Sequence, residues 1–391
     1  MTARTDHKTD TAKALLEAYL ERSGISGAGG DRNRRYLWTD AFAVRGCIGL
    51  AAELEEPEFK NGALRLVDAV HEVLGRHRPD DPEGREGWIS GLPEKEGARH
   101  PTLGGLRIGK AKPERQAHEL GDERLEWEQD GQYFHYLTRW IKTLLRTWRE
   151  TEDRAYGVWA AELMEASRAF VIDRGPCLRM YWKMSIDRSR PLVASMGAHD
   201  PLDGLLCVDA IRKDLPDASA KLDQLELDFQ ALCDGKSWAT PDPLGIGGLL
   251  LDLANLSIRT SGGHAVPPPL KLEKLVLDSF QSLAVFHETH RADCPADRRL
   301  AFRECGLSLG IRVLEACVRH GLLQNISEEK FAREIELADE IEDFWSDPAK
   351  QRARTWTEHE DINAVMLASS LLACRQPWAF AEQVPGNVSA D

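Results

Sequence analysis

Residues 31–56 read DRNRRYLWTDAFAVRGCIGLAAELEE, and this stretch decides how the rest of the chain is interpreted. From about Thr39 to Leu54 it predicts a helix that is rich in small residues. The small residues are Ala41, Ala43, Gly46, Gly49, Ala51 and Ala52. Because small side chains let helices approach one another closely, we expect this helix to be buried and surrounded by other helices.

Helices of this buried type alternate with more amphipathic helices along the chain. Including the first, six helices of the buried type are expected to begin near Asp40, Gly131, Pro201, Leu244, Arg298 and Glu360. The amphipathic partners are expected at residues 57–76, 152–172, 218–233, 270–290 and 328–345, and residues 11–21 supply the twelfth helix. No segment shows the period-two alternation and β-branched enrichment of a strand, so the predicted fold class is all-α.

Twelve helices that alternate in this way resemble the (α/α)6 toroid of the six-hairpin glycosidase-like superfamily. In that fold, an inner ring of six parallel helices is wrapped by an outer ring. The segments LWTDAFAV (residues 37–44) and DPLGIGGLL (242–250) carry the resemblance, because each opens an inner helix behind a Trp, Asp or Gly-rich loop. The resemblance covers nearly the whole chain and implies a single domain of residues 1–391. The nearest alternative is a helical-repeat solenoid, but the hairpins differ in length and share no repeat motif.

The composition is typical of a globular protein with a real core. Of the 391 residues 42% are hydrophobic, and the formal net charge of -14 without a basic block argues against nucleic-acid binding. No apolar run approaches the roughly 20 residues of a membrane helix, and the start MTARTDHKTD does not resemble a signal peptide. The eight cysteines are scattered without a C-x-x-C pair, which is typical of reduced thiols, so we expect a cytoplasmic protein.

Two irregular segments hold most of the unusual residues. The first, of about 50 residues, runs from Arg78 to Glu128. Loops of this length are usually functional or disordered, and the apolar residues in this one favour an ordered segment over the mouth of the funnel that a toroid would have. The second, residues 183–204, reads KMSIDRSRPLVASMGAHDPLDG and combines both charge signs with a histidine. Such loops carry chemistry on rigid scaffolds, although a packed surface loop with internal ion pairs is the alternative.

The resemblance implies that loops entering the inner helices line one funnel, where helix N-termini favour an anionic group. Superfamily members that act on carbohydrates commonly use acidic residues, and the matching candidates here are Asp40, Asp200 and Asp203. Sugar epimerases on the same fold use histidines instead, and the histidine candidates are His135, His199 and His359. We therefore expect the catalytic residues among Asp200, Asp40, Asp203, His135 and His199.

The candidate substrate-binding residues are aromatic, basic and polar residues of the same loops. They are Trp38, Tyr133, Trp88, His100, Arg107, Lys110, Lys183, Arg190, His359 and Glu360. Flat aromatic faces suit sugar rings, and the basic residues favour an acidic saccharide such as a uronate or sugar phosphate. Core packing and plain ion pairing explain the same residues equally well.

The carboxylates and histidines also have structural interpretations. Aspartate is favoured as a helix N-cap, which is the preferred interpretation for Asp130 and Asp242. We expect Asp203 to cap the helix that follows it, which leaves Asp200 for chemistry. A metal site at His199, Asp200 and Asp203, with His135 joining from another helix, is a weaker alternative, because spacing alone is little evidence for one. We expect no metal and no cofactor, and no P-loop or dinucleotide motif is present.

The sequence thus favours a carbohydrate-active enzyme that acts on a small, acidic saccharide, with neither nucleic acid nor membrane as a partner. We expect a glycoside hydrolase rather than an epimerase or lyase. The alternative from another class is a non-catalytic helical protein that binds a ligand or serves as a scaffold. The oligomeric state is left open.

Overall fold

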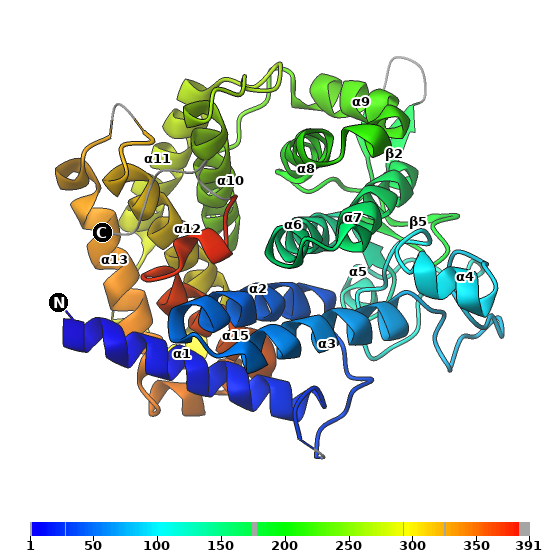
Figure 1. Ribbon diagram of the computed structural model, residues 1–391, viewed down its shortest axis with the longest axis horizontal. Coiled ribbons are helices and arrows are strands. Elements are labelled where there is room, and N and C mark those ends of the chain that lie inside the picture. The colour runs from blue at the N-terminus through cyan, green and yellow to red at the C-terminus, as the bar shows by residue number, and fades with distance from the viewer. Residues whose placement is uncertain (1, 28, 174–177, 292, 324–325, 383–391) are drawn as a thin grey trace. The chain divides into compact units, whose positions relative to one another are not determined.

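The computed structural model describes residues 2–27, 29–173, 178–291, 293–323 and 326–382. Helices dominate this part of the chain, and its five strands contain two or three residues each (Figure 1). The prediction of an all-α protein is therefore confirmed.

The chain divides into two compact units. Unit 1 consists of Met1–Arg22, Arg45–Ala63 and Ser237–Asp391, and unit 2 of Ser23–Val44 and Leu64–Lys236. The boundary falls inside two helices, α2 (Leu37–Leu54) and α3 (Pro57–Leu74).

The remaining helices belong to one unit each. Unit 1 holds α1 (Thr2–Arg22), α10 (Pro243–Ser261), α11 (Leu272–Thr289), α12 (Ala301–Arg319), α13 (Glu328–Ser346), α14 (Arg354–Thr357) and α15 (Glu360–Ala373). Unit 2 holds α4 (Glu94–Arg99), α5 (Glu123–Glu126), α6 (Phe134–Thr151), α7 (Arg154–Ala166), α8 (Asp200–Asp214) and α9 (Asp223–Cys233). All twelve predicted helices are present among them, and α4, α5 and α14 are short additions.

The helices predicted to be the buried set are the more buried ones. In α12, 15 of 19 residues are buried, whereas its amphipathic neighbour α13 buries 7 of 19. The glycines of the buried helices explain how closely they pack. A Cβ on Gly247 of α10 would lie 2.0 Å from the carbonyl oxygen of Gly306 in α12, so the two backbones touch at a point where only glycine fits.

A small sheet in unit 2 includes the two residues that precede α6. Its antiparallel strands lie in the order β1 (Gln132–Tyr133), β4 (Lys183–Met184) and β5 (Pro191–Val193), with Tyr133 opposite Lys183. A separate hairpin pairs β2 (Val171–Asp173) with β3 (Leu178–Met180). The three-stranded sheet brings the segment after residue 181 against the start of α6.

Asp130 binds the irregular segment that runs from residue 78 to 128. The Asp130 carboxylate accepts hydrogen bonds from Gly109 N at 3.0 Å and from Arg107 Nη1 at 2.6 Å. The prediction that Asp130 caps the next helix is wrong, because β1 intervenes and the N-cap of α6 is Tyr133. Asp242 does cap α10, where its carboxylate accepts from Gly245 N at 3.0 Å.

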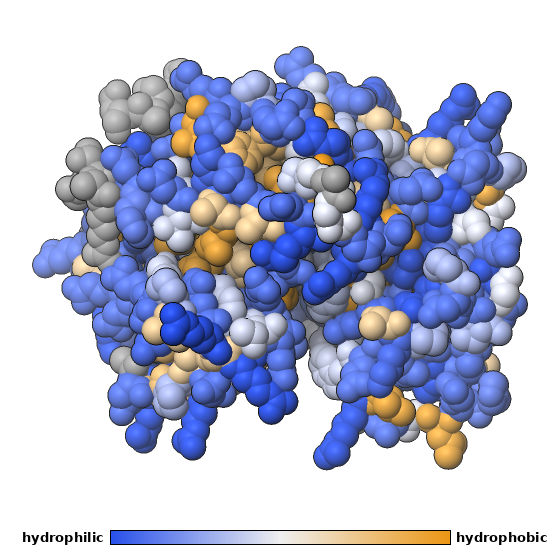
Figure 2. All heavy atoms as spheres, turned by 90° about the horizontal axis from the view of Figure 1, so that it is seen from below, coloured by the Kyte–Doolittle hydropathy of each residue, from blue (hydrophilic) through white to orange (hydrophobic). Residues whose placement is uncertain are grey.

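The face of the molecule drawn in Figure 2 is largely hydrophilic, with hydrophobic side chains in small separate groups. No helix in the described ranges has the length and apolar character needed to cross a bilayer. The described cysteines are free thiols, and most of them are buried.

Candidate functional site

Several of the predicted site residues meet in unit 2, where α6 and α8 begin. Six rings form what we call the aromatic cluster: Tyr36, Trp38, Tyr133, His135, Tyr136 and Trp182. Trp182 stacks on Tyr133 and on His135, with ring centres 5.6 and 5.7 Å apart. Tyr36, His135 and Trp182 keep accessible surface, whereas the other three rings are buried.

His135 is held in one tautomer by its neighbour. The indole N–H of Trp182 donates to Nδ1 of His135 at 2.9 Å, so the proton of the neutral imidazole resides on Nε2. Burial, reinforced by the charge of Arg139, lowers the pKa of His135 to about 3. At neutral pH, His135 is therefore a neutral hydrogen-bond donor and a weak base.

Two cations near the cluster have different surroundings. The Arg139 guanidinium lies 5.8 Å from the centre of the Trp38 ring and pairs with Asp203. The Lys110 ammonium lies 5.1 Å from the centre of the Tyr36 ring and forms no ion pair with any described residue. The cluster thus has one cation that the protein itself leaves available to a ligand.

Trp38 contributes a buried donor. Its side chain is almost fully buried, and its Nε1–H has no hydrogen-bond partner within the described part of the chain. A buried donor left in this way costs about 1–3 kcal/mol, a cost that an acceptor on a bound ligand would relieve.

Asp203 is an ionised carboxylate held by two cations of α6. It accepts from Arg139 Nη2 at 3.0 Å and from Lys142 Nζ at 2.7 Å. Burial opposes its charge, but the two cations outweigh that effect and hold the pKa of Asp203 at about 2. The prediction that Asp203 caps α8 is wrong, because the N-cap residue is His199 and no side chain caps this helix.

Asp200, the first residue of α8, has a raised pKa, in contrast to Asp203. Its carboxyl group is buried and accepts from Gly197 N at 3.0 Å. Burial, with the nearby charge of Asp203, raises the pKa of Asp200 to about 7. Below neutral pH, a protonated and an ionised carboxyl group therefore lie one turn apart on the same helix.

The remaining catalytic candidates have local roles. Asp40 is fully buried and accepts from Arg35 Nη1 at 3.3 Å and from Tyr36 N at 3.1 Å, which fixes the chain as it enters α2. His199 is half-buried and is the N-cap residue of α8.

Lys183 and Arg107 are both buried and bound to the main chain. The Lys183 ammonium donates to the carbonyl oxygens of Glu126 and Gln129 at 2.6 and 2.9 Å. The Arg107 guanidinium donates to the carbonyl oxygen of Val73 at 2.7 Å in addition to its bond with Asp130. Both side chains hold the irregular segment in place.

Each of the other predicted binding residues has contacts of its own outside the cluster. Trp88 is buried beneath the guanidinium of Arg76, and His100 pairs with Glu162 of α7. Arg190 donates to the carbonyl oxygen of Arg115. His359 and Glu360 belong to unit 1, where Glu360 lies 3.4 Å from Arg22.

Arg139, Lys142 and Trp182 were not among the predicted site residues. The spacing of His135, Arg139 and Lys142 along α6 places all three on one helical face, which is the signal that the sequence offered. Their partner Asp203 lies more than 60 residues away, and no local pattern links it to them.

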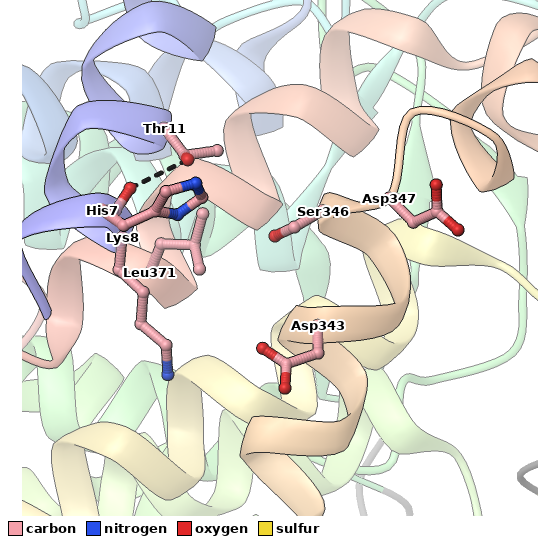
Figure 3. A pocket seen from close by; sticks show the side chains of 7 residues that line it. All are labelled: His7, Lys8, Thr11, Asp343, Ser346, Asp347 and Leu371. Carbon is pink, nitrogen blue, oxygen red and sulfur yellow. Dashed lines mark hydrogen bonds between the residues drawn. The ribbon is translucent and has the colours of Figure 1, made fainter. Parts of the chain in front are cut away.

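Unit 1 has a separate pocket of about 260 Å³ (Figure 3). It is lined by His7, Lys8, Thr11, Asp343, Ser346, Asp347 and Leu371. None of the predicted site residues lines this pocket. Nearby, the Lys8 ammonium pairs with Asp339 and Glu342 at 2.7 and 2.6 Å.

Across the described ranges, no three His, Cys, Asp or Glu side chains are placed to hold a metal ion. No protein-family model matches the chain, and no curated protein has a similar sequence.

Proposed function

We propose that this protein is a glycoside hydrolase that acts on a small, acidic saccharide, with Asp200 as the general acid. One observation carries the proposal: the pKa of Asp200 is raised to about 7 and that of Asp203 is lowered to about 2, one helical turn apart. Paired carboxyl groups whose environments push their pKa values apart are typical of acid/base sites.

In the proposed mechanism, protonated Asp200 donates its proton to the leaving glycosidic oxygen. Ionised Asp203 lies one turn away on the same helix, with its charge balanced by Arg139 and Lys142. It is also the candidate base for the attacking water, although its two ion pairs weaken it as a proton acceptor. Arg139 and Lys142 keep Asp203 ionised while Asp200 holds its proton.

The aromatic cluster supports a sugar as the ligand. Its partly exposed rings offer flat apolar faces with polar edges, which suit the two kinds of surface on a sugar ring. The Nε2–H of His135 is available as a donor to a sugar hydroxyl. The ammonium of Lys110 suits a carboxylate or phosphate on the sugar.

The same geometry argues against the histidine alternative. A sugar epimerase needs a proton acceptor, and a histidine with a pKa of about 3 is a poor one near neutral pH. Nδ1 of His135 is also already engaged by Trp182. We therefore favour the carboxylate reaction over epimerisation.

The arrangement of the helices into the two rings of an (α/α)6 toroid is part of the proposal. The alternation of six buried with six amphipathic helices supports it. A crystal structure in which the six buried helices form one closed inner ring would support the toroid, and an open superhelix would contradict it.

The test combines a substrate screen with a matched pair of variants. Reducing-end release is measured on neutral and uronic-acid oligosaccharides and on sugar phosphates. Asp200→Asn is expected to lower turnover by roughly 10²–10⁴-fold. Asp217→Asn, which removes a partner from the exposed pair with Arg154, is expected to leave turnover unchanged. Normal turnover by the Asp200 variant, or cleavage of no saccharide by the unaltered protein, contradicts the proposal.

A further inference from the structure

We infer that Trp127 forms a second sugar-binding position outside the aromatic cluster, so that the substrate is an oligosaccharide of at least two residues. This inference rests on the proposed function and deepens it. The sequence predictions did not include Trp127.

Trp127 extends the aromatic cluster toward solvent. Its side chain is 52% exposed, and its ring centre lies 4.6 Å from that of Trp182, with the two planes at 75°. Trp182 in turn stacks on Tyr133 and His135. A continuous series of aromatic rings thus runs from the neighbourhood of Asp203 to the surface.

The backbone on both sides of Trp127 is fixed. The Lys183 ammonium is fully buried and donates to the carbonyl oxygens of Glu126 and Gln129, the residues that flank this position. The Glu126 carboxylate also pairs with Lys183 at 3.1 Å and with Arg115. The exposed indole is therefore presented by an ordered segment, and binding to it costs little ordering entropy.

The angle between the two indoles gives them complementary roles. Because the planes are nearly perpendicular, a sugar that stacks on one ring meets the edge of the other. Single exposed apolar side chains are common on proteins, and Leu125 of the same segment is 45% exposed. What distinguishes Trp127 is its contact with a ring of the aromatic cluster.

The experiment compares Trp127→Ala with Leu125→Ala, which removes a similarly exposed apolar side chain two residues away. For each variant, kcat and KM are measured on a series of acidic oligosaccharides of increasing length. On the longer substrates, we expect Trp127→Ala to raise KM and so to lower kcat/KM roughly 10-fold, with kcat unchanged. On the shortest substrate, both constants should stay as they are in the unaltered protein. Leu125→Ala is expected to behave as the unaltered protein does.

Three results overturn the inference. An unchanged length dependence in Trp127→Ala shows that no sugar binds there, although the hydrolase itself would stand. An equal loss at every length assigns the tryptophan to folding or to the catalytic step. An equal loss in both variants indicates an apolar docking surface for another protein. If the unaltered protein neither cleaves a saccharide nor shows a fluorescence change on titration with one, the proposed function fails as well.

Discussion

The carboxyl groups of Asp200 and Asp203 lie one turn apart on α8, yet the pKa of Asp200 is raised to about 7 and that of Asp203 is lowered to about 2. Asp203 is neutralised by two cations, whereas Asp200 accepts one main-chain hydrogen bond and is otherwise buried. The burial that would make Asp200 an effective acid also destabilises the folded protein whenever Asp200 is ionised. The first prediction follows from that cost.

Asp200→Asn should stabilise the protein at alkaline pH. The folded pKa of about 7 lies above the ordinary value of 3.8, so the folded state binds this proton more tightly than the unfolded state does. The ionisation of Asp200 should then lower the free energy of unfolding of the unaltered protein, relative to the variant, by roughly 4 kcal/mol as the pH rises from about 4 to 8. Asparagine carries no charge and can still accept from Gly197 N. Urea unfolding should show a more stable variant at pH 8 and little difference at pH 4. If the variant were less stable than the unaltered protein at pH 8, the raised pKa of buried Asp200 would be wrong.

Asp203→Asn should destabilise the protein and alter the titration of Asp200. The folded pKa of about 2 lies below 3.8, so this carboxylate contributes about 2–3 kcal/mol above pH 4, which is lost as the pH falls through 2. Removing its charge also lowers the pKa of Asp200, because that charge helps to raise it. In a pH–rate profile, the alkaline limb should move to lower pH. An unchanged limb would show that the two carboxyl groups are not coupled.

His135 should not titrate in the physiological range. Its pKa of about 3 keeps the ring neutral above pH 5, with the proton on Nε2 because Nδ1 accepts from Trp182. Nitrogen NMR of the imidazole, assigned with His135→Gln, should show a single tautomer that is constant from pH 5 to 8. In Trp182→Phe the donor to Nδ1 is absent, and a mixture of tautomers is expected. A titration midpoint of His135 near pH 6.5 in the unaltered protein would contradict this low pKa.

Replacing Glu342 of unit 1 should strongly destabilise the folded protein. It is fully buried and accepts from Arg312 Nη2 at 2.8 Å and Lys8 Nζ at 2.6 Å. Burial opposes its charge, but these cations outweigh that effect and lower the pKa of Glu342, so its contribution is lost as the pH falls below 4.5. Glu342→Gln removes the buried partner of Lys8 and Arg312 and leaves them with Asp339, which is partly exposed, so it should cost about 3 kcal/mol at pH 7 in urea unfolding.

The matched control for Glu342 is Glu358→Gln. Glu358 pairs with Arg354 at 2.6 Å on the surface, where both side chains are more than half exposed. Such pairs contribute about 0–1 kcal/mol, so this variant should unfold close to the unaltered protein. If the two substitutions lowered the free energy of unfolding equally, burial would not set the strength of the ion pairs that Glu342 forms with Arg312 and Lys8.

The sequence predicted the helices because their periodicity is a local property. The runs of small and apolar residues in α2 and α10 identified buried helices without knowledge of their neighbours. Asp242 was correctly interpreted as a cap because its helix starts at the next residue. The interpretation of Asp130 failed because a short strand separates it from α6, and two-residue strands leave no periodic signal.

The site was only partly predictable because its ion pairs join distant parts of the chain. Lys183 and Arg107 were interpreted as ligand-binding cations, yet their main-chain acceptors lie about 30 to 60 residues away. The cations that fix Asp203 lie on α6, whose sequence alone does not indicate which carboxylate they meet. Trp38, Tyr133 and His135 were predicted and do cluster, since they lie close to the starts of two helices whose existence the sequence had already indicated.

The way in which unit 1 is assembled has a consequence for protein synthesis. Arg22 at the end of α1 pairs with Asp361 of α15, and 339 positions separate them in the chain. At typical translation rates α1 emerges from the ribosome roughly 20–70 s before its partner is made. Unit 2, which ends at Lys236, is complete well before then. The nascent chain therefore completes unit 2 while unit 1 still lacks α15, and a chain that ends before α15 has no partner for Arg22 at the end of α1.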